Sequence, residues 1–188
     1  MKIDESIVQL GAKLDEWFDG NRATFASRDR KAQGKSFIRG LRIGKELDRL
    51  KADGLAAIAV LLNRHNPVVG DERTVALVRG FEFAAKLADA LHDELLDTDG
   101  GNKVTALMND IAGALDGMSA GRAPLAVLLD SPDARVRASA GAYLIKLMPD
   151  RVLPLLHEIE EGEGGSSAGF HAYWAILRWE RGNKAPGK

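Results

Sequence analysis

Apolar residues recur at helical spacing along almost the whole chain of 188 residues. In the first segment they fall three or four positions apart, which places them on one face of a helix. These residues are Ile3, Ile7, Leu10, Leu14 and Trp17. Later segments repeat this spacing, and no segment shows the alternation of a half-buried strand. The pattern predicts an all-α protein of about nine helices.

Clusters of glycine, proline, asparagine and aspartate separate the helical segments. Residues 19–21 and 97–102 are predicted loops. Ser131, Pro132 and Asp133 form a helix start, because they supply a hydroxyl N-cap, a proline at the first helical position and an acid facing the helix dipole. The helices are expected over residues 3–17, 27–51, 55–62, 77–95, 104–115, 124–129, 132–147, 149–159 and 170–182.

Aromatic residues concentrate in the last of these helices. Phe170, Trp174 and Leu177 are spaced to share one face, and we expect that face to enter the core and close the helical stack. Trp179 falls outside this face, so we expect it to be exposed. An exposed tryptophan is a candidate anchor for a binding partner.

The chain also contains an internal repeat. Residues 54–63 read GLAAIAVLLN, and residues 121–130 read GRAPLAVLLD. Each copy is followed by a polar turn that contains proline and by a longer helix with a Val-Arg pair, at residues 78–79 and 136–137. A short helical unit of this kind cannot bury its apolar face alone, so we expect neighbouring units to stack.

The second copy resembles a HEAT repeat over residues 128–137, with Ala140 and Leu144 following on the second helix. Residues 148–182 are similar to a third, degenerate helical pair, and they end in the Trp-x-x-Gly pattern of small bacterial proteins built this way. The resemblance implies a HEAT-like α-solenoid, a right-handed stack of antiparallel helix pairs. It also implies structural roles for the repeat turn, in which Asp130 or Asp133 orders the turn and Arg137 bridges to a neighbouring repeat.

The resemblance further implies one helical-repeat domain over residues 1–183. Within it we expect an N-terminal helical pair, a first repeat, an inserted helix, a second repeat and a degenerate third repeat. These parts cover residues 1–52, 54–96, 103–117, 121–148 and 149–182. Residues 184–188 are expected to be a disordered tail.

Positive charge concentrates in the second predicted helix, although the net charge of the chain is only −1. Between Arg22 and Lys51 there are ten basic residues and three acidic residues. At about 100° per residue, seven of the basic residues fall within an arc of roughly 120°, which we call the cationic face. Its members are Arg28, Lys31, Lys35, Arg39, Arg42, Lys45 and Arg49.

A cationic face of this kind suits an acidic protein surface or a phosphate backbone. The alternative is a solvated helix face that acids on neighbouring helices partly neutralise. No aromatic residue is interleaved with the cations, so stacking on single-stranded bases has no platform. We therefore expect a protein partner rather than a nucleic acid.

Catalytic and metal-binding patterns are weak. The chain has no cysteine, which excludes disulfides, thiolate metal sites and cysteine nucleophiles. Residues 34–36 imitate the end of a phosphate-binding loop, but Asp29 stands where the required glycine should be. His157, Glu161 and His171 fit no standard zinc spacing. The acidic loop at residues 97–100 has Met108 where calcium requires a bidentate glutamate.

These observations favour a protein that is not an enzyme, needs no cofactor and binds another macromolecule. By analogy with small bacterial helical-repeat proteins, we expect an immunity or adaptor protein that sequesters an acidic partner, such as a toxin domain, through the cationic face. A nucleic-acid binder using the same face is the first alternative, and a metal-dependent hydrolase is the second. The acidic N-terminus lacks the apolar core of a signal peptide, and no run is long enough to span a membrane, so the expected compartment is the cytoplasm.

Overall fold

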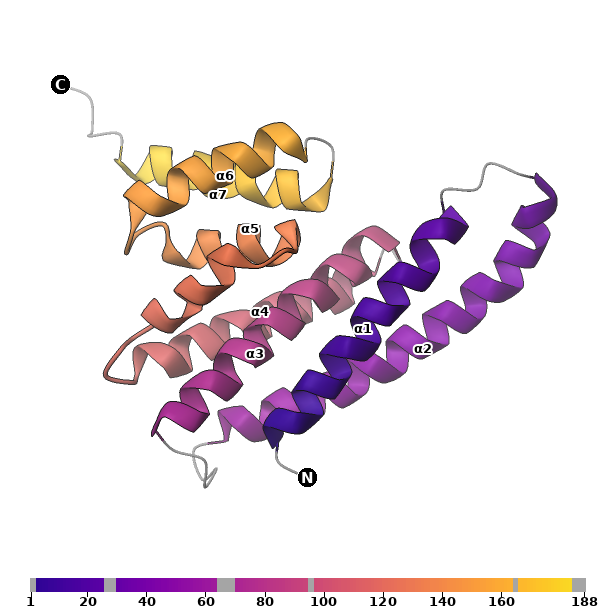
Figure 1. Ribbon diagram of the computed structural model, residues 1–188, viewed down its shortest axis with the longest axis horizontal. Helices are drawn as coiled ribbons and strands as arrows, with labels where there is room; N and C mark the ends of the chain where they lie inside the picture. Colours follow the sequence, from indigo (N-terminus) through magenta and orange to yellow (C-terminus); the bar gives the residue numbers. More distant parts are fainter. Residues whose placement is uncertain (1–2, 26–29, 64–69, 95–96, 164–165, 184–188) are drawn as a thin grey trace. The chain divides into compact units, whose positions relative to one another are not determined.

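The computed structural model describes residues 3–25, 30–63, 70–94, 97–163 and 166–183, and for residues 3–4, 20–25, 30–44 and 93–94 it describes the backbone only. These residues form eight helices and no strand, and one of the helices continues into a π-helical turn (Figure 1). The elements are α1 (Ile3–Phe25), α2 (Arg30–Leu62), α3 (Gly70–Asp89), the π-helical turn η1 (Ala90–Glu94), α4 (Thr98–Asp116), the 3-10 helix η2 (Ala123–Asp130), α5 (Ala134–Leu144), α6 (Pro149–Gly162) and α7 (Ser167–Asn183). The all-α prediction is confirmed.

Two expected helix ends are absent, and the one near Gly54 accounts for the difference between nine expected helices and eight observed ones. The predicted break near Gly54 lies inside α2, which runs without interruption to Leu62. The predicted turn at residues 19–21 lies inside α1. A glycine inside a helix costs about 1 kcal/mol relative to alanine, and burial of apolar side chains such as Ile58 offsets a penalty of that size.

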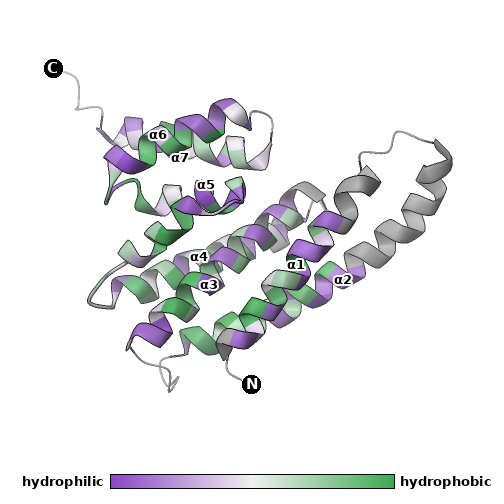
Figure 2. Ribbon diagram, viewed as in Figure 1, coloured by the Kyte–Doolittle hydropathy of each residue, from purple (hydrophilic) through white to green (hydrophobic). Residues whose placement is uncertain are grey.

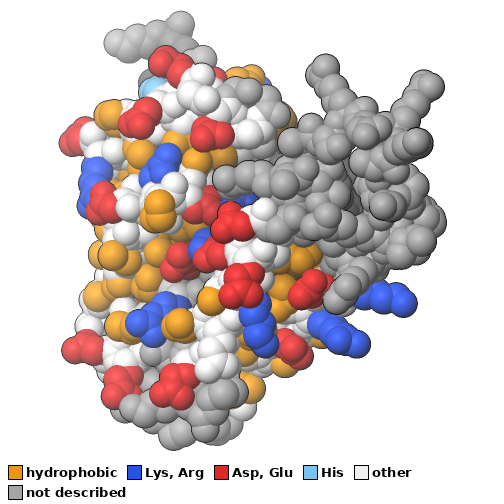
Figure 3. Space-filling view, turned by 45° about the vertical axis from the view of Figure 1, so that its right-hand side comes forward, with side chains coloured by type: hydrophobic (Ala, Val, Ile, Leu, Met, Phe, Trp, Pro, Cys, Tyr) orange, Lys and Arg blue, Asp and Glu red, His pale blue; other side chains and the backbone are white. Residues whose placement is uncertain are grey.

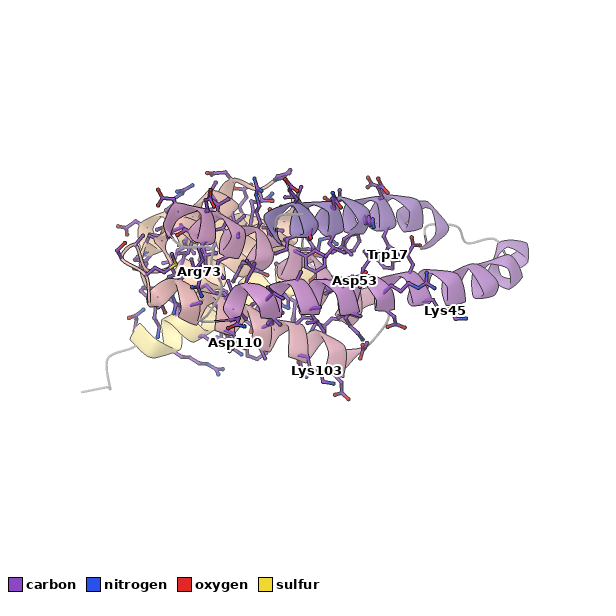
Figure 4. The ribbon with its side chains drawn as sticks, turned by 90° about the horizontal axis from the view of Figure 1, so that it is seen from below. Trp17, Lys45, Asp53, Arg73, Lys103 and Asp110 are labelled. Atoms are coloured by element: carbon purple, nitrogen blue, oxygen red, sulfur yellow. The ribbon has the colours of Figure 1, made fainter. Side chains whose placement is uncertain are left out.

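The chain divides into two compact units, Met1–Leu87 and Ala88–Lys188. In the first unit α1 packs along α2, and Trp17 of α1 lies between the two helices (Figure 4). The stripe predicted from the sequence is the buried one, because Ile7, Leu10, Leu14 and Trp17 are all in the core. On α2 the buried apolar residues are Leu47, Leu50, Ile58 and Leu61.

Gly54 lets α3 approach α2 closely. A Cβ atom at this position would overlap the aromatic ring of Phe83, and Phe83 is itself buried in the core. The glycine that the sequence pattern assigns to a helix end is therefore a packing residue in mid-helix.

A buried lysine ties α3 to α1 within the first unit. The Nζ atom of Lys86 lies 2.9 Å and 3.0 Å from the two carboxylate oxygens of Asp15 on α1. It also lies 3.5 Å from a carboxylate oxygen of Glu82, one turn earlier on α3. Two carboxylates thus face one ammonium group. Their negative charge compensates for the cost of burying the charged lysine.

In the second unit α5 packs against η2, α6 and α7, and α6 packs against α7. The buried residues of α5 include Ala138, Ala140 and Gly141. A Cβ atom on Gly141 would lie 2.9 Å from a methyl carbon of Leu156 on α6, so the two helices are in close contact at this position. Figure 2 shows hydrophobic and hydrophilic residues on different sides of the described helices, as expected of amphipathic helices.

The predicted orientation of the last helix is wrong. Phe170 and Trp174 were expected in the core, but their exposed fractions are 59% and 38%. The buried face of α7 instead consists of small residues and one isoleucine: Ala168, Gly169, Ala172, Ala175 and Ile176. Because the facing helix α5 is also rich in alanine, the two helices pack closely through small side chains, and the aromatic rings are left outside.

The two copies of the internal repeat adopt different helix types but bury two equivalent apolar positions. The first copy is the end of the α-helix α2, whereas the second is the 3-10 helix η2. Ile58 and its counterpart Leu125 are buried, as are Leu61 and its counterpart Leu128. Consecutive helices pack as pairs, as α1 with α2 and α6 with α7 show.

The loop predicted at residues 97–102 is mostly helical. Asp97 is the N-cap of α4, and its side chain accepts a hydrogen bond from the backbone N–H of Gly100 at 2.9 Å. The cluster of polar and small residues therefore begins a helix rather than forming a loop. Among the residues placed by the structure, no helix combines the length and apolar character needed to cross a membrane.

Candidate functional site

The described part of the cationic face consists of Lys45 and Arg49, which stand one turn apart on α2. Both side chains are exposed, and Figure 4 shows Lys45 on the outside of the helix. Leu47 and Leu50, on a different side of the same turns, are buried. Neither cation forms an ion pair with a residue that the structure describes. Arg28 and the side chains of Lys31, Lys35, Arg39 and Arg42 lie outside the described residues.

Acidic residues mark the end of the cationic face. Asp53 follows Arg49 by one turn, falls in the same arc and is exposed (Figure 4). Glu46 is exposed at the edge of the arc. Lys51, on another side of the helix, lies 3.7 Å from the carboxylate of Asp48. The cationic face of α2 therefore ends at Arg49.

The predicted turn residues surround the start of α5. Asp133 is the N-cap of α5, and its carboxylate accepts a hydrogen bond from the backbone N–H of Arg135 at 2.9 Å. The guanidinium of Arg137 donates to the carbonyls of Ser131 and Pro132 at 2.8 Å and 3.1 Å. These carbonyls belong to the same turn, whereas the HEAT resemblance implies a bridge from Arg137 to a neighbouring repeat.

Asp130 links η2 to α6. Its two carboxylate oxygens each accept a hydrogen bond of 2.9 Å from Arg151, near the start of α6. Both side chains are largely exposed, so this ion pair is screened by solvent and contributes little to stability.

A buried polar cluster centres on Asp89, the last residue of α3. Asp89 is only 4% exposed. Its carboxylate accepts a hydrogen bond from the hydroxyl of Ser167 on α7 and lies 3.7 Å from the Nε atom of Arg135 on α5. Arg135 also forms a two-point pair with Asp133. Sequence reasoning missed this cluster, and the only signal was an acid in the middle of the apolar run at residues 81–91.

The polar groups of this cluster form hydrogen bonds and ion pairs with one another, so we assign the cluster a structural role. The hydroxyl of Ser167 donates directly to a carboxylate, and no histidine stands between them as the general base of a serine nucleophile would. The cluster holds the end of α3, the start of α5 and the start of α7 together within the second unit.

A second polar cluster joins α4, η2 and α5. The hydroxyl of Tyr143 donates to the side-chain oxygen of Asn109 at 2.7 Å, and burial raises the pKa of Tyr143 to about 12. The Arg122 guanidinium donates to Asp116 at 2.9 Å through Nε. This hydrogen bond lowers the pKa of the Asp116 carboxyl and raises the pKa of Arg122. The raised pKa extends the range in which Tyr143 can donate to Asn109 to a higher pH than an ordinary tyrosine would allow.

The exposed aromatic residues of α7 form a continuous row, which we call the aromatic row. It consists of Phe170, Tyr173 and Trp174, whose exposed fractions are 59%, 44% and 38%. The Phe170 and Trp174 rings meet edge to face with centroids 5.9 Å apart, and the Tyr173 and Trp174 rings do so at 5.7 Å. Trp179, the anchor proposed from the sequence, is half-buried and lies toward the buried side of the helix. The exposed aromatic surface of α7 therefore lies one to two turns earlier than expected.

Metal-ligating side chains do not gather in the described part of the chain, where no group of three or more histidine, aspartate or glutamate residues could hold a metal ion. His157 lies 3.5 Å from the carboxylate of Glu160, while Glu161, the residue suggested by its spacing, is exposed. On the face shown in Figure 3, acidic and basic side chains of the described residues are interspersed.

Comparison of the chain with protein-family models, with curated proteins and with solved structures finds no match. The candidate sites therefore depend on their own geometry, which offers two exposed surfaces among the described side chains: Lys45 and Arg49 of the cationic face, and the aromatic row of α7.

Proposed function

We propose that this protein is a non-catalytic protein-binding module that holds an acidic surface of its partner against the cationic face of α2. The observation that carries the proposal is the exposure of Lys45 and Arg49 without an ion pair to any described residue. Unpaired surface cations accelerate the approach of an acidic partner and orient it.

The helical backbone of α2 supports a longer cationic face. The helix is continuous from Arg30 to Leu62, so the basic residues from position 31 to position 49 lie along one helix axis. Their spacing of three and four residues keeps them within the same arc. Several cations in a row attract an acidic surface more strongly than an isolated pair does.

The finer form of the proposal is a small bacterial immunity or adaptor protein of the cytoplasm, with HEAT-like stacked helix pairs, that sequesters a partner such as a toxin domain. Its support is the repeat at residues 54–63 and 121–130, which buries two equivalent apolar positions in both copies, together with the pairwise packing of consecutive helices. Binding by such a surface needs complementarity of shape and charge and no reactive group.

The test compares two charge-reversal variants in quantitative capture of partners from the native host. Lys45→Glu with Arg49→Glu should reduce capture of the specific partner by about tenfold or more. The matched control is Lys103→Glu with Lys146→Glu, which makes the same change in net charge at two exposed lysines of the second unit. Both variants should keep the wild-type melting temperature, because all four side chains are exposed. Equal losses in the two variants would refute a specific role for α2.

Two further outcomes would replace the proposal. Retention on duplex DNA or RNA at physiological ionic strength, lost in the Lys45→Glu, Arg49→Glu variant, would assign the same face to phosphate binding. One equivalent of zinc or manganese retained after incubation and dialysis, together with metal-dependent hydrolysis, would make the protein an enzyme.

A further inference from the structure

The exposed face of α7 carries two kinds of side chain at its two ends. The aromatic row occupies the N-terminal part of this face. Arg178 and Arg181 lie one to two turns further along the helix and are also exposed. At about 100° per residue, the aromatic rings and Arg181 fall on the side opposite the buried alanines, and Arg178 lies at the edge of this exposed face.

We propose that α7 pairs antiparallel with α7 of a second copy of this chain, about a two-fold axis near the middle of the helix. Phe170 and Arg181 are equally far from the midpoint between Ala175 and Ile176, and Trp174 and Arg178 share almost the same midpoint. An antiparallel partner therefore places its arginines opposite the aromatic rings. A two-fold axis requires self-complementarity of this kind.

The chemistry of the pairs selects this orientation. A guanidinium over the face of an aromatic ring is attracted by the ring quadrupole, and both rings of one copy gain such a partner from the other. Parallel pairing would instead set Arg178 and Arg181 against the same arginines of the second copy. The net charge of −1 per chain leaves little overall repulsion between two copies.

The exposed area sets the strength of the dimer. Since aromatic side chains bury 150–250 Å² each, the exposed fractions of the aromatic row amount to about 300 Å² per copy. Stable specific interfaces bury about 800 Å² per partner, and the neighbouring Leu177 and arginines supply part of the difference. An interface below the standard size is typical of weak association, so we expect the dimer to be reversible.

Single cysteines test the pairing directly, because the natural chain has none. Leu177→Cys, close to the two-fold axis, should form disulfide-linked dimers under mild oxidation. Phe170→Cys alone and Arg181→Cys alone should not, because at 1.5 Å per residue each lies about 16 Å along the axis from its own copy, and a disulfide requires Cα atoms within about 7 Å. An equimolar mixture of these two variants should form the cross-linked heterodimer.

Exposed Val127 on η2 provides the matched control, since Val127→Cys in the same unit should stay monomeric. A Phe170→Cys variant that links to itself would indicate parallel pairing and overturn the proposal. So would the absence of cross-links in every variant, together with a monomer in sedimentation equilibrium at millimolar concentration. Circular dichroism on each variant verifies that it is folded.

Charge reversal separates this dimer from binding at α2. Arg178→Glu with Arg181→Glu should raise the dimer dissociation constant by about tenfold or more, since each change acts twice in a two-fold dimer. Lys45→Glu with Arg49→Glu should leave the constant unchanged. A dimer that tolerates the arginine changes would refute the pairing, whatever the outcome of partner capture.

Discussion

Two arginines of the second unit show how burial changes the effect of an ion pair. The Arg135 side chain is 19% exposed and faces Asp133 and the buried Asp89. The Arg151 side chain is 48% exposed and pairs with Asp130, which is 75% exposed. Removing the Arg135 cation leaves the buried carboxylate of Asp89 with less compensation for its charge. Removing the Arg151 cation has little effect, because water already solvates the carboxylate of Asp130.

We therefore expect Arg135→Met to lower the free energy of unfolding by about 2–3 kcal/mol at neutral pH. Arg151→Met, the same substitution at an exposed pair, should lower it by less than about 1 kcal/mol. Urea denaturation followed by circular dichroism measures both values. Similar losses in the two variants would show that Asp89 does not depend on Arg135.

At the scale of residues, the sequence predicted local roles better than distant ones. A helix start near Ser131 to Asp133 could be recognised because N-capping depends on residues two or three positions away, but the N-cap is Asp133 and not the predicted Ser131, and Pro132 precedes the helix. Asp89 could not, since its partners Arg135 and Ser167 are distant in the chain. Exposure of Trp179 was wrongly expected because the neighbouring aromatic residues were assigned to the core.

Helix packing depends on where small residues lie, as the contact between α2 and α3 shows. Gly54 faces the ring of Phe83 without space for a methyl group. Gly11 lies in the interior of α1. Apart from the backbone of that helix, no atom lies within 4 Å of the place where a Cβ of residue 11 would stand. An alanine at position 11 therefore changes helix propensity alone, whereas an alanine at position 54 also changes the packing against Phe83.

Gly54→Ala should destabilise the protein by about 1–3 kcal/mol, because the added methyl group displaces a buried ring. Gly11→Ala should stabilise it by about 0.5–1 kcal/mol, since alanine favours the helix and meets no neighbour. Thermal unfolding of both variants measures the difference. Stabilisation by alanine at position 54 would show that Phe83 moves aside at little cost.

At the scale of elements, apolar periodicity predicted the buried faces of several helices. The predicted stripe of α1 is buried, and in α6 three of the four apolar residues at helical spacing, Val152, Leu156 and Ile159, are buried, while Leu155 is only partly so. The method was wrong for α7 because it takes the largest apolar residues as the core-facing ones. Alanines on α5 allow a close contact that only small residues of α7 can match.

Charge is divided between the two compact units of the chain. Met1–Leu87 contains 16 lysines and arginines and 12 acidic residues, a net charge of +4, and Ala88–Lys188 contains 10 and 15, a net charge of −5. The sum is the net charge of −1 for the whole chain. The composition of the whole chain conceals this division, which the local excess of basic residues before position 52 predicted.

Each unit buries its own apolar residues, so we expect urea to unfold the chain in two steps. A variant with Trp174→Phe and Trp179→Phe retains Trp17 as its single tryptophan, and Trp17 reports on the first unit. Its fluorescence should follow one step only, while far-ultraviolet circular dichroism follows both. Superimposable curves would show that the two units unfold as one.

At the scale of the whole molecule, the all-α fold was predictable because each helix carries its own periodic signal. The number of helices was not predictable, because α2 continues through Gly54 where the sequence suggests a break. Gly54 is buried against Phe83 of α3, which is distant in the chain. The stacking of repeats into a solenoid stays a prediction, since residues 54–63 and 121–130 fold as different kinds of helix.

The π-helical turn at the end of α3 also affects how this chain should be compared with others. A π turn holds one residue more than the α-helical turn that it replaces, so residues Ala90–Glu94 depart from the helical phase of α3. In an alignment with a relative that has an uninterrupted α-helix here, a gap of one residue belongs inside this turn. Without that gap, later positions would be one residue out of register, and a core position such as Val104 would be matched with an exposed neighbour.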